Sequence, residues 1–232
     1  ASVLHLATYA AAAALADGGP GAAVCEVLRS AETIAVDVEG SNLGHGGRAA
    51  TIQLATPDLC YVVDLAALGM PDSLREVLQG KDPVKVCHGF TNDQINLIEQ
   101  FHIDFSEATL FDTAEALEYL PHIGGKSVVD VLERFTAAPP HVLSEMVGMK
   151  EQLRWVDFFQ RPLPERVLRY SCLDVVFLVS ARSTMIEQLN ETDVACIAIV
   201  EKSRYRGPYG KGDCYRPPTM NQIARQEKKR KT

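Results

Sequence analysis

Several features that would assign the chain to a large class of proteins are missing from its 232 residues. No apolar run reaches 18 residues, so no segment is expected to form a transmembrane helix or to contact a membrane. The alanine-rich stretch 10–16 lacks a basic flank and is too short for a signal peptide. The six cysteines show no CxxC or zinc-ligand spacing, which excludes a cysteine-based redox or metal motif.

The cysteines are scattered, and most of them lie in apolar surroundings. This setting favours buried free thiols, which persist in a reducing compartment. We therefore expect an intracellular protein, and the sequence does not separate the mitochondrion from the cytoplasm or nucleus. A hydrophobic content of 47% and a charged content of 23% are typical of a globular protein with a proper core.

Charge is distributed unevenly along the chain. The net charge is −7, but residues 202–232 carry ten Lys and Arg against two acids, so this end is +8 and the rest is −15. The same end interleaves Tyr205, Tyr209 and Tyr215 with basic residues. That composition suits contact with a single-stranded nucleic acid, and it equally suits a solvated terminus without a specific role. The length predicts one domain over 1–200 followed by this basic tail over 201–232.

Gly and Pro divide the chain into short strands and helices. Neighbouring strands with short turns predict an antiparallel or mixed unit, and strands that then alternate with helices predict parallel pairing. The fold class is therefore α/β, with a mixed sheet flanked by helices and a helical C-terminal half. The expected elements are, in order, strand 3–6, helix 8–17, helix 22–30, strands 33–38, 49–56 and 60–65, helix 72–79, strand 84–88, helix 91–101, strand 109–111, helix 113–120, further helix from 127, one long helix 164–190 and helix 192–203.

The predicted strand in "TIAVDVEG", residues 33–40, ends in two carboxylates. Asp37 and Glu39 are two residues apart, so on a strand both side chains face the same side of the sheet. Like charges on one face repel unless a positive group lies between them. Because sites in open α/β sheets gather at the carboxyl ends of strands, Asp93, which follows strand 84–88, is a candidate neighbour.

A further carboxylate lies in the apolar stretch "RYSCLDVVFL". Asp174 needs a partner there, and Tyr170 shares its helical face four residues earlier. A set of oxygen ligands selects Mg²⁺ or Mn²⁺, and two such ions suit phosphodiester hydrolysis. Taken singly, Asp93 suits a first-turn helix charge and Tyr170 suits a core residue, so the prediction depends on the set and its order.

These motifs, in this order, resemble the DEDDy subgroup of 3′–5′ exonucleases, and RNase D-type domains in particular. The three motifs are "AVDVEG", "KVCHGFTNDQINLI" and "YSCLD"; "LFDTAEAL" and "VDFFQRPLPERVLRYSCLD" are similar to ancillary segments, and "VEGSNLGHGGRAATIQLAT" is similar to Egalitarian-type exonuclease-domain proteins. The resemblance covers about residues 3–190 and implies a ribonuclease H-like fold. One departure is that Phe158 stands where the family has Trp before RPL, while the only Trp is Trp155.

The resemblance implies a role for each motif residue and a cofactor of two Mg²⁺ or Mn²⁺ ions. Asp37, Glu39 and Asp174 would hold the catalytic ion, and Asp37 would bridge to a second ion held by Asp93 through water. Tyr170 would orient the attacking water, since a phenol with a pKa near 10 is a poor base at neutral pH. Asp112 would support the site from nearby or act only as a helix N-cap.

Residues around these motifs are candidates for substrate contact. The backbone of Val38 and Gly40 would lie against the terminal nucleotide, and Gly permits a close approach. His88, Asn92 and Gln53 would contact the nucleotide or satisfy the local backbone. The candidates for phosphate contact are Arg48 and Lys85, which are otherwise ordinary surface charges.

The implied function is metal-dependent 3′–5′ exoribonuclease activity on single-stranded RNA with a free 3′ end, releasing nucleoside 5′-monophosphates. Small or guide RNA trimming is one family role of this kind, and protein partners are unknown. Two alternatives remain open: a non-catalytic RNA-binding adaptor on the same fold, and a 3′–5′ DNA exonuclease. The complete set of five motif residues disfavours an adaptor.

Overall fold

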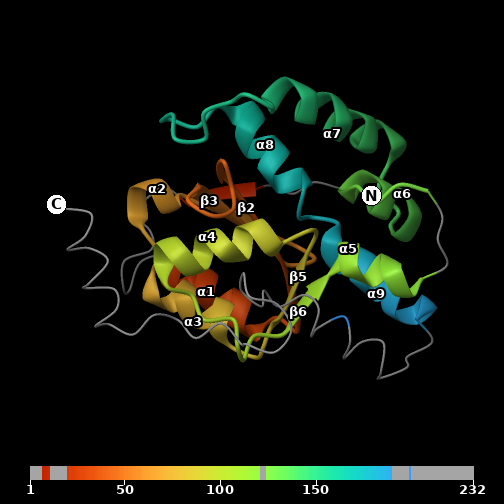
Figure 1. Ribbon diagram of the computed structural model, residues 1–232, viewed down its shortest axis with the longest axis horizontal. Helices are drawn as coiled ribbons and strands as arrows, with labels where there is room; N and C mark the ends of the chain where they lie inside the picture. The colour runs from red at the N-terminus through yellow and green to blue at the C-terminus, as the bar shows by residue number, and fades with distance from the viewer. Residues whose placement is uncertain (1–6, 11–19, 121–123, 190–198, 200–232) are drawn as a thin grey trace.

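The centre of the molecule is a six-stranded mixed sheet in the order β1-β4-β3-β2-β5-β6 (Figure 1). The computed structural model describes residues 7–10, 20–120, 124–189 and 199. Its strands are β1 (Ala7–Ala10), β2 (Thr33–Ser41), β3 (Arg48–Ala55), β4 (Cys60–Val63), β5 (Val84–Cys87) and β6 (Leu110–Asp112). The β2–β3 and β3–β4 pairs are antiparallel, and the β1–β4, β2–β5 and β5–β6 pairs are parallel. The mixed sheet predicted from the sequence is therefore confirmed.

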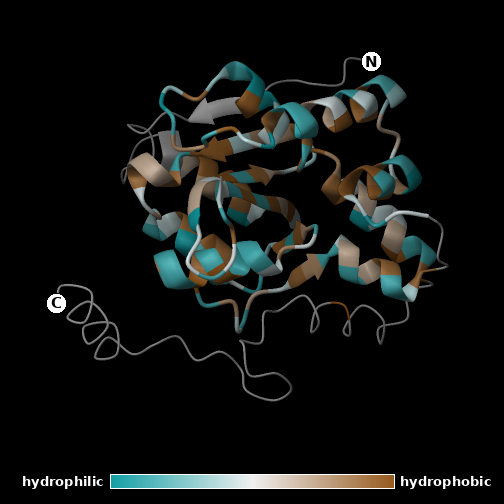
Figure 2. Cartoon of the chain, turned by 45° about the horizontal axis from the view of Figure 1, so that its top comes forward, coloured by the Kyte–Doolittle hydropathy of each residue, from teal (hydrophilic) through white to brown (hydrophobic). Residues whose placement is uncertain are grey.

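Helices cover both faces of this sheet (Figure 1). One face packs against α1 (Pro20–Ser30), α3 (Asp72–Gln79) and α4 (Thr91–Phe101). The other packs against a helical layer made of α5 (Thr113–Ala116), α6 (Val128–Phe135), α7 (Pro140–Leu153), α8 (Glu165–Leu173) and α9 (Leu178–Gln188). The short α2 (Leu65–Leu68) follows β4, and a 3₁₀ turn (Leu117–Tyr119) follows α5. Hydrophobic residues gather in the central strands and on the helix faces turned toward them (Figure 2).

Strand β2 lies inside the sheet, between β3 and β5. Side chains alternate between the two faces of this strand, so Ile34, Val36 and Val38 pack in the core beneath α1, α3 and α4. The intervening positions, which include Asp37 and Glu39, face the helical layer. A register shift at Glu39/Gly40 then bends the end of the strand. The two acids are thus held on β2 by its ladder with β3, while β5 pairs with β2 only over residues 33–35.

The structure differs from the sequence prediction in several described places. The expected strand 60–65 ends at Val63, and helix α2 begins at Leu65. Thr8 lies within strand β1 rather than at the start of a helix. The single helix expected over 164–190 is two helices, because α8 ends at Leu173 and α9 begins at Leu178. No Gly or Pro marks this break, and four turn residues there let α9 run back to pack on α6, β2 and β5. The expected strand 3–6, the basic tail and all of helix 192–203 except Ile199 lie outside the described residues.

Gly40 is required by the neighbouring strand rather than by a ligand. A Cβ at Gly40 would lie 2.0 Å from the Arg48 carbonyl oxygen on β3, a distance that backbone atoms do not tolerate. The close approach of β3 therefore explains the glycine at this position, and contact of its backbone with a nucleotide stays a prediction.

We predict that Gly40→Ala lowers the free energy of unfolding by about 1–3 kcal/mol, since the added methyl forces β2 and β3 apart. Gly148, inside α7, is the matched control, because a Cβ there meets nothing within 4 Å. Gly148→Ala should raise stability by about 0.5–1 kcal/mol through the helix propensity of Ala. Urea denaturation of both variants measures the two values, and equal effects would contradict the close approach at Gly40.

Candidate active site

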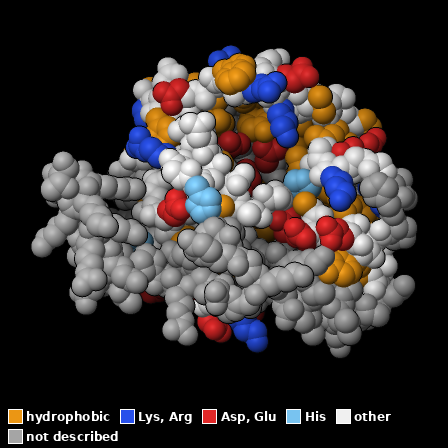
Figure 3. Space-filling model, in the orientation of Figure 1, with side chains coloured by type: hydrophobic (Ala, Val, Ile, Leu, Met, Phe, Trp, Pro, Cys, Tyr) orange, Lys and Arg blue, Asp and Glu red, His pale blue; other side chains and the backbone are white. Residues whose placement is uncertain are grey.

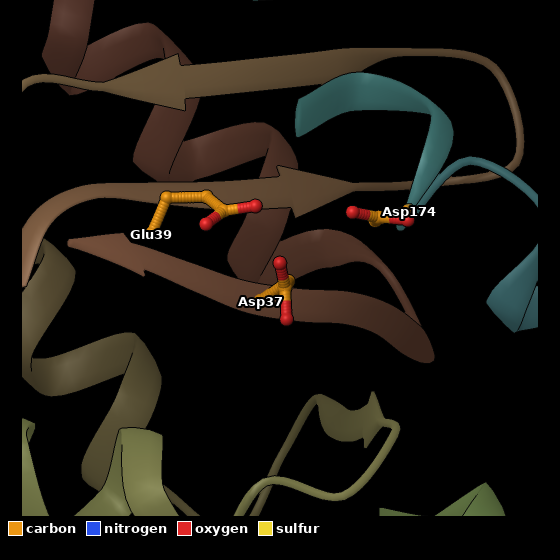
Figure 4. Close-up of side chains that lie close together, drawn as sticks. All are labelled: Asp37, Glu39 and Asp174. Carbon is orange, nitrogen blue, oxygen red and sulfur yellow. The ribbon is translucent and has the colours of Figure 1, made fainter. Parts of the chain in front are cut away.

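Three carboxylates from distant parts of the chain meet above the sheet. Asp37 and Glu39 project from β2, and Asp174 projects from the turn that follows α8 (Figure 4). One ligand oxygen from each of them lies within 4.8 Å of the other two. The helix break at Asp174 matters here, because the residue is the C-cap of α8 and points toward the two strand acids. Three of the four carboxylates predicted to converge therefore do so.

Their protonation shows how strained this arrangement is without a cation. Burial, followed by repulsion from Asp93, Glu39 and Asp174, raises the pKa of Asp37 well above its usual value. Burial and the charges of Asp174 and Asp93 raise the pKa of Glu39 to about 8. Burial also raises the pKa of Asp174 to about 6. A cation among these oxygens would remove the cause of the repulsion, since it favours the charged form of each acid.

Asp93 stands in the first turn of α4 and lines the same pocket, outside the tight group of three. Burial raises its pKa to about 7. Its position depends on Asp112, whose carboxylate accepts hydrogen bonds from the amides of Gly89 and Phe90 at 2.8 Å each. Asp112 also caps α5 through the Ala114 amide. The predicted N-cap at Asp112 is therefore confirmed, and its further bonds to the loop before α4 agree with a supporting role at the site, which stays a prediction.

Tyr170 lies on α8, one turn before Asp174, and its hydroxyl donates a hydrogen bond to that carboxylate. Burial and the charges of Asp174 and Glu39 raise the pKa of the phenol well above its usual value near 10. The hydroxyl is therefore protonated at neutral pH. It can orient a water molecule as a hydrogen-bonding group, but it cannot act as a base.

An ion pair fixes α8 against the sheet. The Arg161 guanidinium donates two hydrogen bonds to the carboxylate of Asp64, which is buried after β4. Burial would raise the pKa of Asp64, but the hydrogen bond and charge of Arg161 hold it below its usual value. Phe158, which stands in place of the Trp expected before this arginine, is buried in a cluster with Tyr170. Removing either member of the pair would leave an uncompensated charge under α8.

The carboxylates form the floor of a pocket of about 260 Å³. In the space-filling view, acidic side chains lie at the bottom of a hollow whose upper edge carries Lys, Arg and apolar side chains (Figure 3). The lining consists of Asp37, Val38, Glu39, Leu43, His88, Gly89, Asn92, Asp93, Val128, Lys150, Tyr170, Asp174 and Leu178. A volume of this size suits a single nucleotide unit rather than a duplex.

The predicted substrate residues divide into two groups. Val38, His88 and Asn92 line the pocket. His88 is also tied to the wall, because its Nδ1 lies 2.9 Å from the Thr113 hydroxyl, which donates to the Cys87 carbonyl. Burial lowers the pKa of His88, so the ring is neutral at pH 7.

The remaining four candidates do not line the pocket. Gln53 is fully buried on β3, in register with Asp37, and donates to the Thr51 hydroxyl, so its placement against the nucleotide was wrong. Lys85 is 1% exposed and donates to the Gly80 carbonyl, so it is not a surface phosphate contact. Gly40 faces β3, as described above. Arg48 is exposed outside the pocket, with its guanidinium over the Phe159 ring.

Lys150 is the charged residue of the pocket lining that the sequence did not predict. It projects from α7, and its positive charge lowers the pKa of both Glu39 and Asp174. Nothing in its local sequence distinguishes it from other surface lysines. Its place at the site follows from the docking of α7 against α8, which the sequence does not display.

Comparison with known proteins identifies the family of the chain. A family model described as a 3′–5′ exonuclease matches residues 21–190. The chain belongs to this exonuclease family. Its RNase D-like character, predicted from the motifs, is thereby confirmed, while placement in the Egalitarian-type subgroup stays a prediction.

Individual relatives agree with the family match. Protein RRP6-like 3 from Arabidopsis thaliana is 31% identical over 170 residues, which is 72% of this chain and 18% of that protein. Escherichia coli RNase D superposes with a TM-score of 0.65 at 18% identity, covering 86% of this chain and 51% of that one. Brucella melitensis NrnC, solved with bound Mg²⁺, gives a TM-score of 0.59 at 18% identity over 74% of this chain and 82% of that one. The two structural matches show a shared ribonuclease H-like fold.

The metal-free exonuclease should lose stability as pH rises, because its site acids hold protons more tightly when folded than when unfolded. The stabilisation that these protonated acids add to the free energy of unfolding is complete below about pH 4. It is lost as the pH passes about 6 for Asp174 and about 8 for Glu39. In EDTA, Glu39→Gln should therefore gain at least about 1 kcal/mol over the wild type between pH 5 and pH 8.

Urea denaturation across this pH range measures the gain, and Glu107→Gln, at an exposed acid away from the pocket, is the control. If the free energies of unfolding of Glu39→Gln and the wild type differ by the same amount at every pH, the pKa of Glu39 is not raised in the folded protein.

Proposed function

We propose that the chain is a metal-dependent 3′–5′ exoribonuclease domain that releases nucleoside 5′-monophosphates from single-stranded RNA with a free 3′ end. The observation that carries the proposal is the convergence of Asp37, Glu39 and Asp174 within 4.8 Å, with raised pKa values, at the floor of a nucleotide-sized pocket. A group of acids that repel one another at neutral pH is poorly suited to a purely structural role. It is well suited to holding a cation beside a phosphodiester.

The donor set fits Mg²⁺ or Mn²⁺. All of the donors are carboxylate oxygens, which are hard ligands, and no His or Cys stands among the three. Asp37, Glu39 and Asp174 would hold one ion, and Asp37 with Asp93 would hold a second. When bound, such a pair supplies Lewis acidity for the attacking water and for the leaving oxygen.

The chain's own residues supply position and electrostatic attraction. Tyr170 stays protonated, so its hydroxyl orients water while its bond to Asp174 fixes the carboxylate. Lys150 places a positive charge over a floor that would otherwise repel a phosphate. The backbone of Val38 and the side chain of Asn92 form the wall along which the terminal nucleotide would lie. Pocket size limits entry to an unpaired strand end.

RNA is the favoured substrate. E. coli RNase D is described as an exoribonuclease involved in structured RNA processing, and this chain shares its fold. The terminal 2′-OH would distinguish RNA from DNA, and Glu39 at the pocket floor is the candidate acceptor for it. The chain spans 18% of the length of the Arabidopsis relative. That the whole protein acts on RNA inside the cell is therefore part of the same proposal.

The experiment that tests this function uses about 12-nucleotide RNA and DNA oligonucleotides labelled at the 3′ end, in Mg²⁺ or Mn²⁺. We expect labelled mononucleotide to be released from RNA, and we expect Asp37→Asn and Asp174→Asn to lower its rate at least about 1,000-fold while the protein stays folded. Circular dichroism of each variant is the control for folding.

Three outcomes would contradict parts of the proposal. Release from DNA and not from RNA would favour a DNA exonuclease. Binding without release from either would favour an adaptor. Release that survives both substitutions would show that the three carboxylates are not the site.

A further inference from the structure

The only Trp in the chain is almost fully exposed. Trp155 is 86% exposed, while Phe158, three residues later in the same segment, is buried. Trp is enriched at binding interfaces, so an indole exposed to this degree is a candidate contact for a ligand. Trp155 belongs to none of the core clusters of the described residues.

Each of two arginines lies against an aromatic ring of this segment. The Arg154 guanidinium stands 5.3 Å from the centre of the Trp155 ring, and the Arg48 guanidinium stands 4.5 Å from the centre of the Phe159 ring. Both arginines are exposed, whereas Phe159 is half-buried. We call these four residues, Arg48, Arg154, Trp155 and Phe159, the aromatic–arginine rim.

The rim residues do not line the catalytic pocket themselves, but three of them are linked to residues that do. Arg154 is the C-cap of α7 in helical conformation, four residues after the pocket residue Lys150, so both side chains lie on one helix face. Phe159 packs on the cluster that contains Tyr170. Arg48 pairs in register with Ser41, two residues beyond Glu39 on β2. Lys, Arg and apolar side chains border the acidic hollow in the space-filling view (Figure 3).

We propose that the aromatic–arginine rim binds the single-stranded part of the substrate upstream of its last two nucleotides, with bases stacked on the aromatic rings and phosphates held by the arginines. This inference rests on the proposed function, because a strand whose 3′ end reaches Asp37 and Asp174 must leave the pocket across its border. The rim would then set affinity for long substrates, and the carboxylates would set the rate of cleavage.

The local positive charge of the rim favours a nucleic acid as its ligand, against the negative charge of the rest of the chain. The chain outside residues 202–232 carries a net charge of −15, which opposes any polyanion. Arginines beside the pocket locally offset that repulsion and can meet successive phosphates. Stacking on aromatic rings accepts every base, as an exonuclease that advances along a strand requires. A surface that pairs arginines with aromatic rings beside the pocket therefore matches a single strand in both chemistry and position.

Because Trp155 is the only Trp, its fluorescence reports on the rim directly. The test uses the full chain carrying Asp174→Asn in Mg²⁺, titrated with an about 12-nucleotide oligouridylate, with the blunt duplex of the same length and with the dinucleotide UpU. We expect the 12-mer to quench Trp155 emission to saturation. The duplex and UpU should leave it unchanged, because neither places an unpaired base on the rim.

Kinetics of the active chain give the second readout. Trp155→Ala and Arg154→Ala should each raise KM for the 12-mer about tenfold, leave kcat unchanged and leave kcat/KM for UpU unchanged. Trp155→Phe should restore most of the affinity. Arg29→Ala is the matched control, since it removes the same charge from α1 on the opposite face of the sheet and should change neither value.

The outcomes separate the rim from the proposed function. If both substrates are hydrolysed but the 12-mer neither quenches Trp155 nor loses affinity in Trp155→Ala, the rim proposal is wrong and the exonuclease stands. If nothing is hydrolysed but the 12-mer quenches Trp155 and Arg154→Ala prevents it, the rim stands and the nuclease does not. If no substrate is hydrolysed and the 12-mer does not quench Trp155, the rim proposal and the proposed function are both wrong. A protein partner would then be the candidate occupant of the surface.

Discussion

Repulsion among partly buried carboxylates is the constraint on which the rest of the structure depends. Asp37, Glu39 and Asp174 are brought within 4.8 Å of one another in surroundings that raise the pKa of each. The metal-free fold therefore meets a cost that only protonation or a cation relieves. A protein that gained nothing from this arrangement would be more stable with amides or apolar residues there. The three carboxylates thus lower the stability of the metal-free fold in return for a site that can bind a cation.

Much of the architecture serves to hold these acids against their repulsion. Strand β2 pairs with β5 before the two acids and with β3 at the acids, so Asp37 and Glu39 cannot move apart without breaking hydrogen bonds of the β2–β3 ladder. The Arg161–Asp64 pair holds the segment that leads into α8, and the break after Leu173 aims Asp174 at the strand. Asp112 fixes the loop that begins α4 and thereby places Asp93. Lys150 is the cation that the chain itself contributes to the pocket.

Local pattern was sufficient to predict most of the elements and the acids of the site. The i, i+2 spacing of Asp37 and Glu39 on an apolar strand determines that they share a face, and the YxxxD spacing determines that Tyr170 and Asp174 share another. What local pattern could not supply was tertiary packing. The end of α8 has no Gly or Pro, Lys150 reaches the site only because α7 docks on α8, and Gln53 is buried because the helical layer covers its face. Gly40 looked like a substrate contact, whereas the Arg48 backbone fills the space beside it.

The central claim is that the three carboxylates form a divalent-cation site. Crystals of the protein soaked in Mn²⁺ and measured for anomalous scattering test it most directly, because the ion is located without reference to activity. We predict a strong peak among the oxygens of Asp37, Glu39 and Asp174, absent in Asp174→Asn. A fully soaked crystal with no peak there, or with Mn²⁺ bound only at other acids, would contradict the account.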